Sequence, residues 1–132
     1  QAVVIGADTV IYFEQKIIGK PRTMKEAIAT LRSLQNRQHW VYTGVCLCRG
    51  ESRQQMLFYE RTKVLFKKMG EGAVKRYLAA IDPFDKAGAY AIQEHGDRII
   101  KKISGSYANV IGFPIETFRK KLKVFLRIGK KK

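Results

Sequence analysis

The sequence predicts an α/β domain in which helices flank a β-sheet. Apolar and polar residues alternate over 41–48 and again over 55–66, whereas apolar residues recur at every third or fourth position from Met24 and from Ile115. Alternation is typical of strands and the wider spacing of helices, so both kinds of element occur along the chain. The chain has 132 residues, 45% of them hydrophobic, which is enough for one core. We therefore expect a single domain over residues 1–132.

The first element is an apolar segment that leads into a pair of polar residues. Val3 to Ile5 predict a buried strand that passes through Asp8-Thr9 and then either continues or gives way to a second strand at 10–13. Thr23-Met24-Lys25-Glu26 has the pattern of a capping box, in which the first and last side chains bond the exposed backbone of a helix start. A helix is therefore expected from about Met24 to Asn36.

A hairpin follows this helix. Gly50-Glu51-Ser52 supplies a turn between the two alternating stretches, which predicts two antiparallel strands. On the second strand one row of side chains is mainly apolar, and Glu60 lies in that row.

Shorter elements fill the second half of the chain. We expect a short helix from Val74 to Ile81, a loop from Pro83 to Gly88, an apolar segment at 99–103, a loop from Gly105 to Gly112 and a helix opened by Pro114.

The charge of the chain is strongly positive. The formal net charge is +15, and residues 119–132 hold eight basic residues and no acidic one, so a basic helix end and tail are expected there. Such a tail attracts nucleic acid, acidic membranes and triphosphates alike and does not identify a partner. No apolar run approaches the roughly 20 residues that cross a bilayer, and we expect a cytoplasmic protein. Cys46 and Cys48 are expected to be buried thiols, with metal ligation as the alternative.

Asp8 is the first candidate for chemistry. A carboxylate at the end of a buried strand is in the position where open α/β sheets bind ligands, and Thr9 accompanies it. The alternative is that both residues only form a turn or a cap, since both side chains readily bond local backbone.

Two lysines are candidates for phosphate contacts. Lys20 lies in Gly19-Lys20-Pro21, between a flexible and a rigid residue, although a surface turn is the simpler explanation of this motif when it is taken alone. Lys86 lies in Asp85-Lys86-Ala87-Gly88-Ala89-Tyr90, whose small residues allow close backbone approach to a ligand. The chain contains no P-loop motif.

Two further polar residues have less certain roles. Gln93 carries an amide that can donate to and accept from a base edge, or it is simply solvated. Glu60 in its apolar row must be paired, protonated or bound to a metal if it is buried.

Six short motifs, taken in order, resemble the Maf family of nucleoside triphosphate pyrophosphatases. They are Gly6-Ala7-Asp8-Thr9-Val10, Gly19-Lys20-Pro21, Thr43-Gly44-Val45, Glu60-Arg61-Thr62, Asp85-Lys86-Ala87-Gly88-Ala89-Tyr90 with Ile92-Gln93, and Asn109-Val110-Ile111-Gly112-Phe113-Pro114. The resemblance implies a Maf/inosine-triphosphatase-like fold with a twisted mixed sheet, and hydrolysis of a nucleoside triphosphate to the monophosphate and pyrophosphate with Mg²⁺ or Mn²⁺.

The resemblance also assigns roles to residues. It implies that Asp8 is the proton acceptor, and we expect Asp8 and Glu60 to hold the metal and Lys20 and Lys86 to bind phosphate. Thr9 and Gln93 match the branch that looks like dTTP and UTP pyrophosphatases, so Gln93 is expected to contact the pyrimidine.

The match has a limit at its N-terminal side. Family members open with a strand and a Ser-x-Ser-x-Arg-Arg turn that precede the motifs seen here, so we expect an N-terminally incomplete Maf-like domain. The family often forms dimers, which makes a homodimer an expectation. A basic nucleic-acid-binding module and a catalytically inactive Maf-like remnant are the alternatives to the enzyme.

Overall fold

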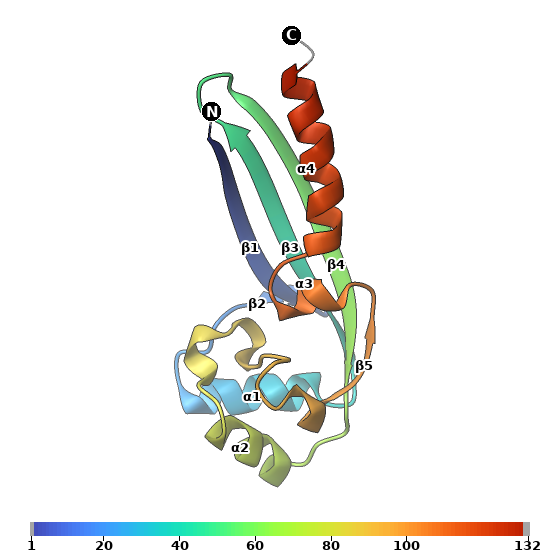
Figure 1. Ribbon diagram of the computed structural model, residues 1–132. Helices are drawn as coiled ribbons and strands as arrows, with labels where there is room; N and C mark the ends of the chain where they lie inside the picture. Colours follow the sequence, from blue (N-terminus) through green and yellow to red (C-terminus); the bar gives the residue numbers. More distant parts are fainter. Residues whose placement is uncertain (1, 131–132) are drawn as a thin grey trace.

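A five-stranded sheet with helices at one end and along one face makes up the protein (Figure 1). The computed structural model describes residues 2–130, with side chains described up to residue 128. The elements in chain order are β1 (Val3–Phe13), β2 (Lys16–Ile18), α1 (Met24–Leu34), β3 (Gln38–Arg49), β4 (Gln54–Phe66), α2 (Glu71–Ala79), the 3₁₀ turns η1 (Pro83–Asp85), η2 (Ala87–Ala89) and η3 (Gly96–Arg98), β5 (Ile100–Ser104), α3 (Tyr107–Ile111) and α4 (Ile115–Lys130).

The sheet has the strand order β2-β1-β3-β4-β5, and each neighbouring pair in the described chain is antiparallel. The β3–β4 hairpin predicted from alternation is confirmed, with Val45 opposite Phe58. The predicted α/β fold with a helix-flanked sheet is also confirmed, but the expectation of a mixed sheet was wrong, because every described strand pair is antiparallel. Because β2 pairs only with Ile11 to Phe13, most of β1 has no partner from β2 on its outer edge.

Two apolar clusters hold the layers together. The larger one packs Leu31 and Leu34 of α1 and Tyr77 of α2 against Val64 and Phe66 of the sheet, all almost fully buried. Burying a leucine or phenylalanine side chain stabilises the fold by about 1.5–3 kcal/mol. The smaller cluster packs the apolar side of α4 on the sheet, where Phe125 of α4 meets Val45 and Leu47 of β3.

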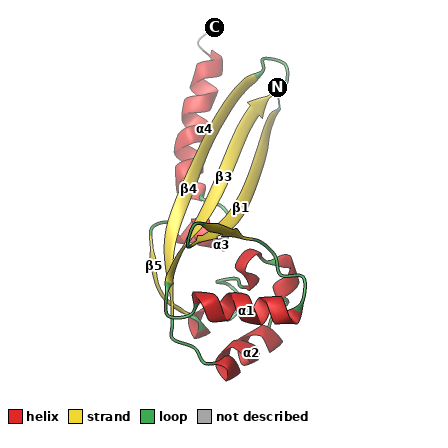
Figure 2. Ribbon diagram, turned by 180° about the vertical axis from the view of Figure 1, so that it is seen from behind, coloured by secondary structure: helices red, strands yellow, loops and turns green. Residues whose placement is uncertain are grey.

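In the described part of the chain, no helix lies on the other side of the sheet from α4, as the rear view shows (Figure 2). Leu57 and Tyr59 are 71% and 66% exposed there. Cys46 and Cys48 lie on the same face and are half-buried, with their sulfur atoms 3.2 Å apart. The expectation of buried thiols was therefore wrong, because α4 covers only the other face.

Helix α1 begins where the sequence predicts. Thr23 Oγ1 accepts a hydrogen bond from the Glu26 N–H at 3.1 Å, and the Glu26 carboxylate accepts one from the Arg22 N–H rather than from Thr23. The helix ends at Leu34, two residues before the expected Asn36.

Two expectations about local structure were wrong. The first apolar segment was expected to be buried, but Val4 and Ile5 in it are exposed. It continues past Asp8-Thr9 as one strand to Phe13, which was one of the two alternatives. The segment from Gly105 to Gly112 is not all loop, because it contains the helix α3.

The C-terminal helix follows its apolar spacing as predicted. It runs from Ile115 to Lys130, so the predicted basic helix end is helical as far as it is described, and the last two residues of the predicted tail lie outside the described residues. None of the helices within residues 2–130 combines the length and apolar character needed to cross a membrane.

Candidate active site

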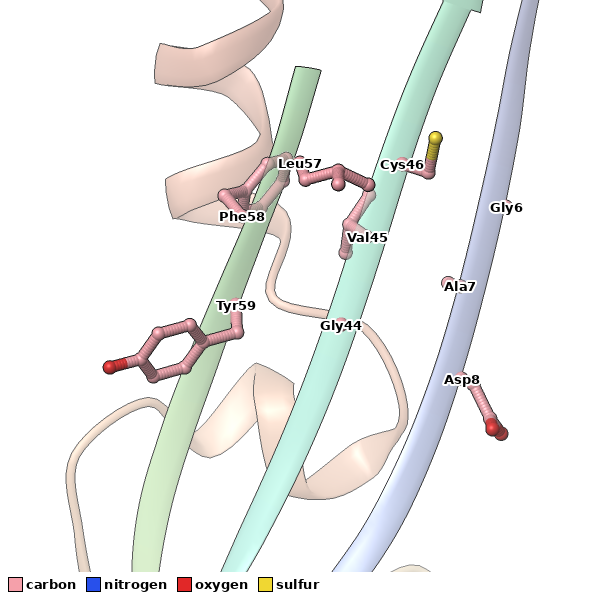
Figure 3. Close-up of a pocket in the computed structure, with 9 residues that line it drawn as sticks. All are labelled: Gly6, Ala7, Asp8, Gly44, Val45, Cys46, Leu57, Phe58 and Tyr59. Atoms are coloured by element: carbon pink, nitrogen blue, oxygen red, sulfur yellow. The ribbon is translucent and has the colours of Figure 1, made fainter. Parts of the chain in front are cut away.

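Asp8 lies in the middle of β1, at the exposed outer edge of the sheet. Its backbone pairs with Gly44 of β3, and in Figure 3 its carboxylate points away from β3. Because the strand alternates, Asp8 belongs to the face opposite α4, with Gly6, whereas Thr9 belongs to the face that α4 covers. The sequence had placed Asp8 at a strand end; its carboxylate is exposed instead because no helix of the described chain covers this face.

A cavity of about 320 Å³ lies beside this edge and gathers four of the five residues that the sequence predicts for catalysis and substrate binding. Those four are Asp8, Thr9, Lys20 and Lys86. The other walls are formed by Ala7, Ile11, Val41, Asp85, Ala87, Tyr90, Ala91, Val110, Ile111 and Gly112. One carboxylate and two ammonium groups on a single cavity make an arrangement that can bind a polyanion and act on it.

A larger, shallow hollow of about 490 Å³ covers the open sheet face (Figure 3). It shares Asp8 with the first cavity, but the rest of its wall comes from small and apolar residues such as Gly44, Leu57 and Phe58. Its wall contains no basic residue that would attract a phosphate, so the smaller cavity is the better candidate for an active site.

A backbone contact joins the two lysine loops. The Gly88 N–H donates to the Gly19 carbonyl at 3.1 Å, which ties the residue before Lys20 to the loop that carries Lys86. Gly88 has a φ of +73°, and a Cβ there would lie 3.0 Å from Ile11. Glycine therefore fits this turn, because it adopts positive φ without strain and allows the close contact.

The Lys86 ammonium is held by three oxygens. It donates to the Asp82 carbonyl at 2.8 Å, and it forms ion pairs with Asp85 at 2.8 Å and Glu94 at 2.9 Å. Burial acts to lower the pKa of Lys86, but the bonds to Asp85 and Glu94 outweigh it and raise the pKa above its usual value. The same contact with Lys86 lowers the pKa of Asp85. An ammonium has three donors, so Lys86 must exchange one of these oxygens to bind a phosphate directly.

Thr9 and Lys20 differ in how firmly they are held. Thr9 shares a hydrogen bond of 2.9 Å with Thr43 on the neighbouring strand, so its hydroxyl already has one hydrogen-bond partner within the sheet. Lys20 is exposed, lies two positions after the end of β2 and precedes the buried Pro21. Lys20 is thus the more available of the two lysines.

Tyr90 lines the cavity, and a buried histidine holds its hydroxyl in place. Its hydroxyl shares a hydrogen bond of 2.6 Å with Nε2 of His39, which is 1% exposed. Burial lowers the pKa of His39 to about 4 and raises that of Tyr90 well above its usual value, so both are neutral at physiological pH. This pair was not anticipated from sequence, because the partners are 51 positions apart.

Gln93 does not line the same cavity. It lines a neighbouring one of about 300 Å³, together with His95 and Tyr107 among others. Tyr107 is a residue that the sequence did not single out, because its helix α3 was expected to be a loop. Ser106 followed three residues later by Asn109 was the available signal, since Ser106 Oγ accepts from the Asn109 N–H as an N-cap.

Glu60 is separated from Asp8 by the sheet. It pairs with Thr43 and shares the face that α4 covers, where its carboxylate accepts a hydrogen bond from the Thr117 hydroxyl of α4. The structure therefore does not bring Glu60 into the cavity with Asp8, and metal binding by both residues stays a prediction.

Asn109 attaches α3 to the sheet. Its side-chain amide donates to the Val41 carbonyl at 3.1 Å and to Thr62 Oγ1 at 3.0 Å, with the Glu60 carbonyl at 3.4 Å. Helix α3 contributes Val110 to the cavity wall, so this buried amide determines where the wall lies.

A metal ion would find few ligands here. Among the described residues no group of three or more histidine, cysteine and carboxylate side chains could hold one. Mg²⁺, however, usually takes one or two carboxylates and completes its coordination with water and substrate phosphates. The exposed Asp8 carboxylate fits that pattern.

Comparisons with known proteins agree with the motifs. The family model described as Maf-like protein matches residues 1–125. A dTTP/UTP pyrophosphatase of Pelotomaculum thermopropionicum is 42% identical over 124 residues, which cover 94% of this chain and 65% of the relative. One of a Thermoanaerobacter species is 44% identical over 87% of this chain and 60% of its own length. One of Bacillus cereus is 42% identical over 93% of this chain and 63% of its own length. The chain thus spans less than two thirds of the length of these relatives.

Proposed function

Since this chain belongs to the Maf family, we propose that it hydrolyses dTTP and UTP to the nucleoside monophosphate and pyrophosphate. The observation that carries the proposal is the cavity that joins Asp8 to Lys20 and Lys86. Three relatives of about 42–44% identity are dTTP/UTP pyrophosphatases, which supports the same substrates for this chain. Nucleoside triphosphates are intracellular, so we propose the cytoplasm as the site of action, and a homodimer as the assembly.

Asp8 is the proposed general base. Its carboxylate is exposed at the cavity edge, so it can accept a proton from a water molecule that attacks the α-phosphorus. The water loses its proton to Asp8, a new P–O bond forms, and the bond between the α-phosphorus and the bridging oxygen breaks to release pyrophosphate. A positioned base of this kind typically contributes about 10²- to 10⁴-fold in rate.

The two lysines have different proposed tasks. Lys20 is exposed and can contact the terminal phosphates directly, as a flexible point charge. Lys86 is 12% exposed and already holds three oxygens, so it supplies positive charge to the cavity and contacts phosphate only by exchanging Asp85 or Glu94. Both charges favour the negative charge that builds up on the leaving pyrophosphate.

A divalent cation, Mg²⁺ or Mn²⁺, is the proposed cofactor. Asp8 would hold it together with the substrate phosphates, and the ion would neutralise part of the phosphate charge.

The proposed specificity residues are Thr9 and Gln93. Thr9 adjoins the general base and its hydroxyl is oriented by Thr43. Gln93 lies in the neighbouring cavity, where its amide can donate to and accept from the edge of a pyrimidine.

Product analysis tests the proposal. The purified protein is incubated with dTTP, UTP or GTP and Mg²⁺ or Mn²⁺, and monophosphate, diphosphate, pyrophosphate and orthophosphate are separated. We expect equal amounts of pyrophosphate and monophosphate from dTTP and UTP, and much less turnover of GTP. Release of orthophosphate with accumulation of the diphosphate, or no turnover with either metal, would contradict the proposal.

A further inference from the structure

The cavity beside Gln93 is bounded by three parts of the chain. The loop 92–97 forms one side, and Tyr107, the first residue of α3, forms another. Ile100 of β5 closes the cavity from a third side. The cavity measures about 300 Å³ and is open to solvent beside Gln93, which is itself exposed.

The walls of this cavity and of the phosphate cavity are formed by residues that adjoin one another in the chain. Ala91 lines the phosphate cavity, and the next residue, Ile92, lines the second one. Val110 and Ile111 line the phosphate cavity, while Tyr107 lies three and four positions earlier on the same helix. Residues at this spacing are neighbours on one helix face, with Cβ atoms roughly 5–6 Å apart. One ligand with an anionic end and a flat end can therefore occupy both cavities.

Tyr107 presents an unused aromatic ring. It is 55% exposed, and none of the ring pairs found among the described residues includes it. Other tyrosines of the chain are engaged: Tyr90 packs on Phe66, and Tyr42 packs on Tyr59.

The position of Tyr107 is nevertheless fixed. Ser106 caps α3, and the Asn109 side chain bonds the helix to β3 and β4. The Tyr107 ring is therefore exposed, while its backbone is held in place by α3. A stacking contact needs this combination.

We propose that Tyr107 is the stacking platform for the nucleobase of the substrate, with Gln93 beside it to bond the base edge. The inference rests on the proposed function, and it adds a binding residue that neither the motifs nor the family comparison assigns. Stacking is an interaction of the ring face, so it does not need the tyrosine hydroxyl. It also tolerates different bases, so Tyr107 contributes affinity and Gln93 contributes selectivity.

Binding experiments on three variants test this inference. Tyr107→Ala and Tyr107→Leu remove the ring, while Tyr107→Phe keeps it without the hydroxyl. Stacking of a base on an aromatic ring is worth about 1–3 kcal/mol, which corresponds to roughly 5- to 150-fold in affinity. In calorimetric titrations we expect the affinity of the Ala and Leu variants for dTMP to fall by that factor. The affinity of the Phe variant should stay within about twofold of the wild type. Tyr107→Leu keeps an apolar side chain at the helix start, so it serves if the Ala variant folds poorly.

Inorganic tripolyphosphate is the control ligand, because it has no base. We expect all three variants to bind it as the wild type does. Wild-type affinity of Tyr107→Leu for dTMP would overturn the inference, and so would an equal loss of dTMP and tripolyphosphate binding, since Tyr107 would then only support the wall. If the wild type binds dTMP through Tyr107 but releases no pyrophosphate from dTTP, the proposed function fails and the inference stands.

Discussion

The buried His39 makes the stability of the protein depend on pH in a way that the structure specifies. Its ring is 1% exposed, packs edge-on against Phe66 with centroids 4.8 Å apart, and uses Nε2 to bond Tyr90. The other nitrogen, Nδ1, is buried without a partner in the described structure. Protonation would place a charge there with nothing to balance it, which is why burial lowers the pKa to about 4.

The magnitude follows from the difference between the two pKa values. The ordinary value is 6.5 and the folded value about 4, so the shift is about 2.5 units at 1.36 kcal/mol each, or about 3 kcal/mol. Below pH 6.5 the unfolded chain binds a proton that the folded protein does not, so protonation favours unfolding. The contribution is fully present above about pH 6.5 and is lost as the pH falls to about 4.

Urea unfolding followed by circular dichroism at pH 7 and pH 5 measures this effect. His39→Gln keeps a polar group near the Tyr90 hydroxyl but cannot titrate in this range. Between these pH values the wild type is expected to lose about 2 kcal/mol more of its free energy of unfolding than His39→Gln does. His95→Gln, at an exposed histidine, is the matched control and should behave as the wild type. An identical pH dependence in the wild type and His39→Gln would refute the reasoning.

Three further predictions concern the cavity walls. Asn109→Ala removes the donor to two buried acceptors and should lower the free energy of unfolding by about 2–3 kcal/mol, measured by urea unfolding; a loss below about 1 kcal/mol would contradict this. Gly88→Ala places a side chain at a φ of +73° and 3.0 Å from Ile11, so we expect a loss of about 1–2 kcal/mol in the same assay. Glu94→Gln removes one of the charges that hold Lys86, and calorimetry should show tripolyphosphate binding a few-fold tighter; unchanged or weaker binding would mean that Glu94 does not compete with phosphate.

Much of the fold could be predicted because its signals are local. The capping box at Thr23 and the spacing of Leu31 and Leu34 depend on neighbours within a turn or two, and α1 begins where they indicate. The alternation of β3 and β4 likewise gave the hairpin and the face on which Glu60 lies.

The position of Asp8 within its strand could not be predicted in the same way. Asp and Thr commonly end a strand, but here Thr9 bonds Thr43 across the sheet and the backbone pairing continues on both sides of Asp8. The deciding contacts come from residues about 35 positions away, which a local pattern does not contain.

Helix α3 was missed for a related reason. It has only five residues and lies between Gly105 and Gly112, both with positive φ, so the local pattern is that of a loop. It is held in place by the bonds of Asn109 to β3 and β4, which are tertiary contacts. Tyr107 and the second cavity escaped sequence analysis along with the helix.

Sequence and structure contribute different parts of the description of the candidate active site. Family motifs selected Asp8, Lys20 and Lys86, and the structure brings these three to one cavity. The motif that holds Lys86 also contains its partner Asp85, but it gave no sign of the second partner, Glu94, which lies eight positions further along.

The proposal that Asp8 is the general base of a nucleotide pyrophosphatase is tested most directly by one measurement. Pyrophosphate release from dTTP is compared for the wild type, Asp8→Asn and Glu116→Gln, the last at an exposed carboxylate of α4 outside the cavity. We predict that Asp8→Asn lowers turnover by about 10²- to 10⁴-fold, with an unchanged circular dichroism spectrum, while Glu116→Gln matches the wild type. Turnover by Asp8→Asn within about twofold of the wild type would contradict the account.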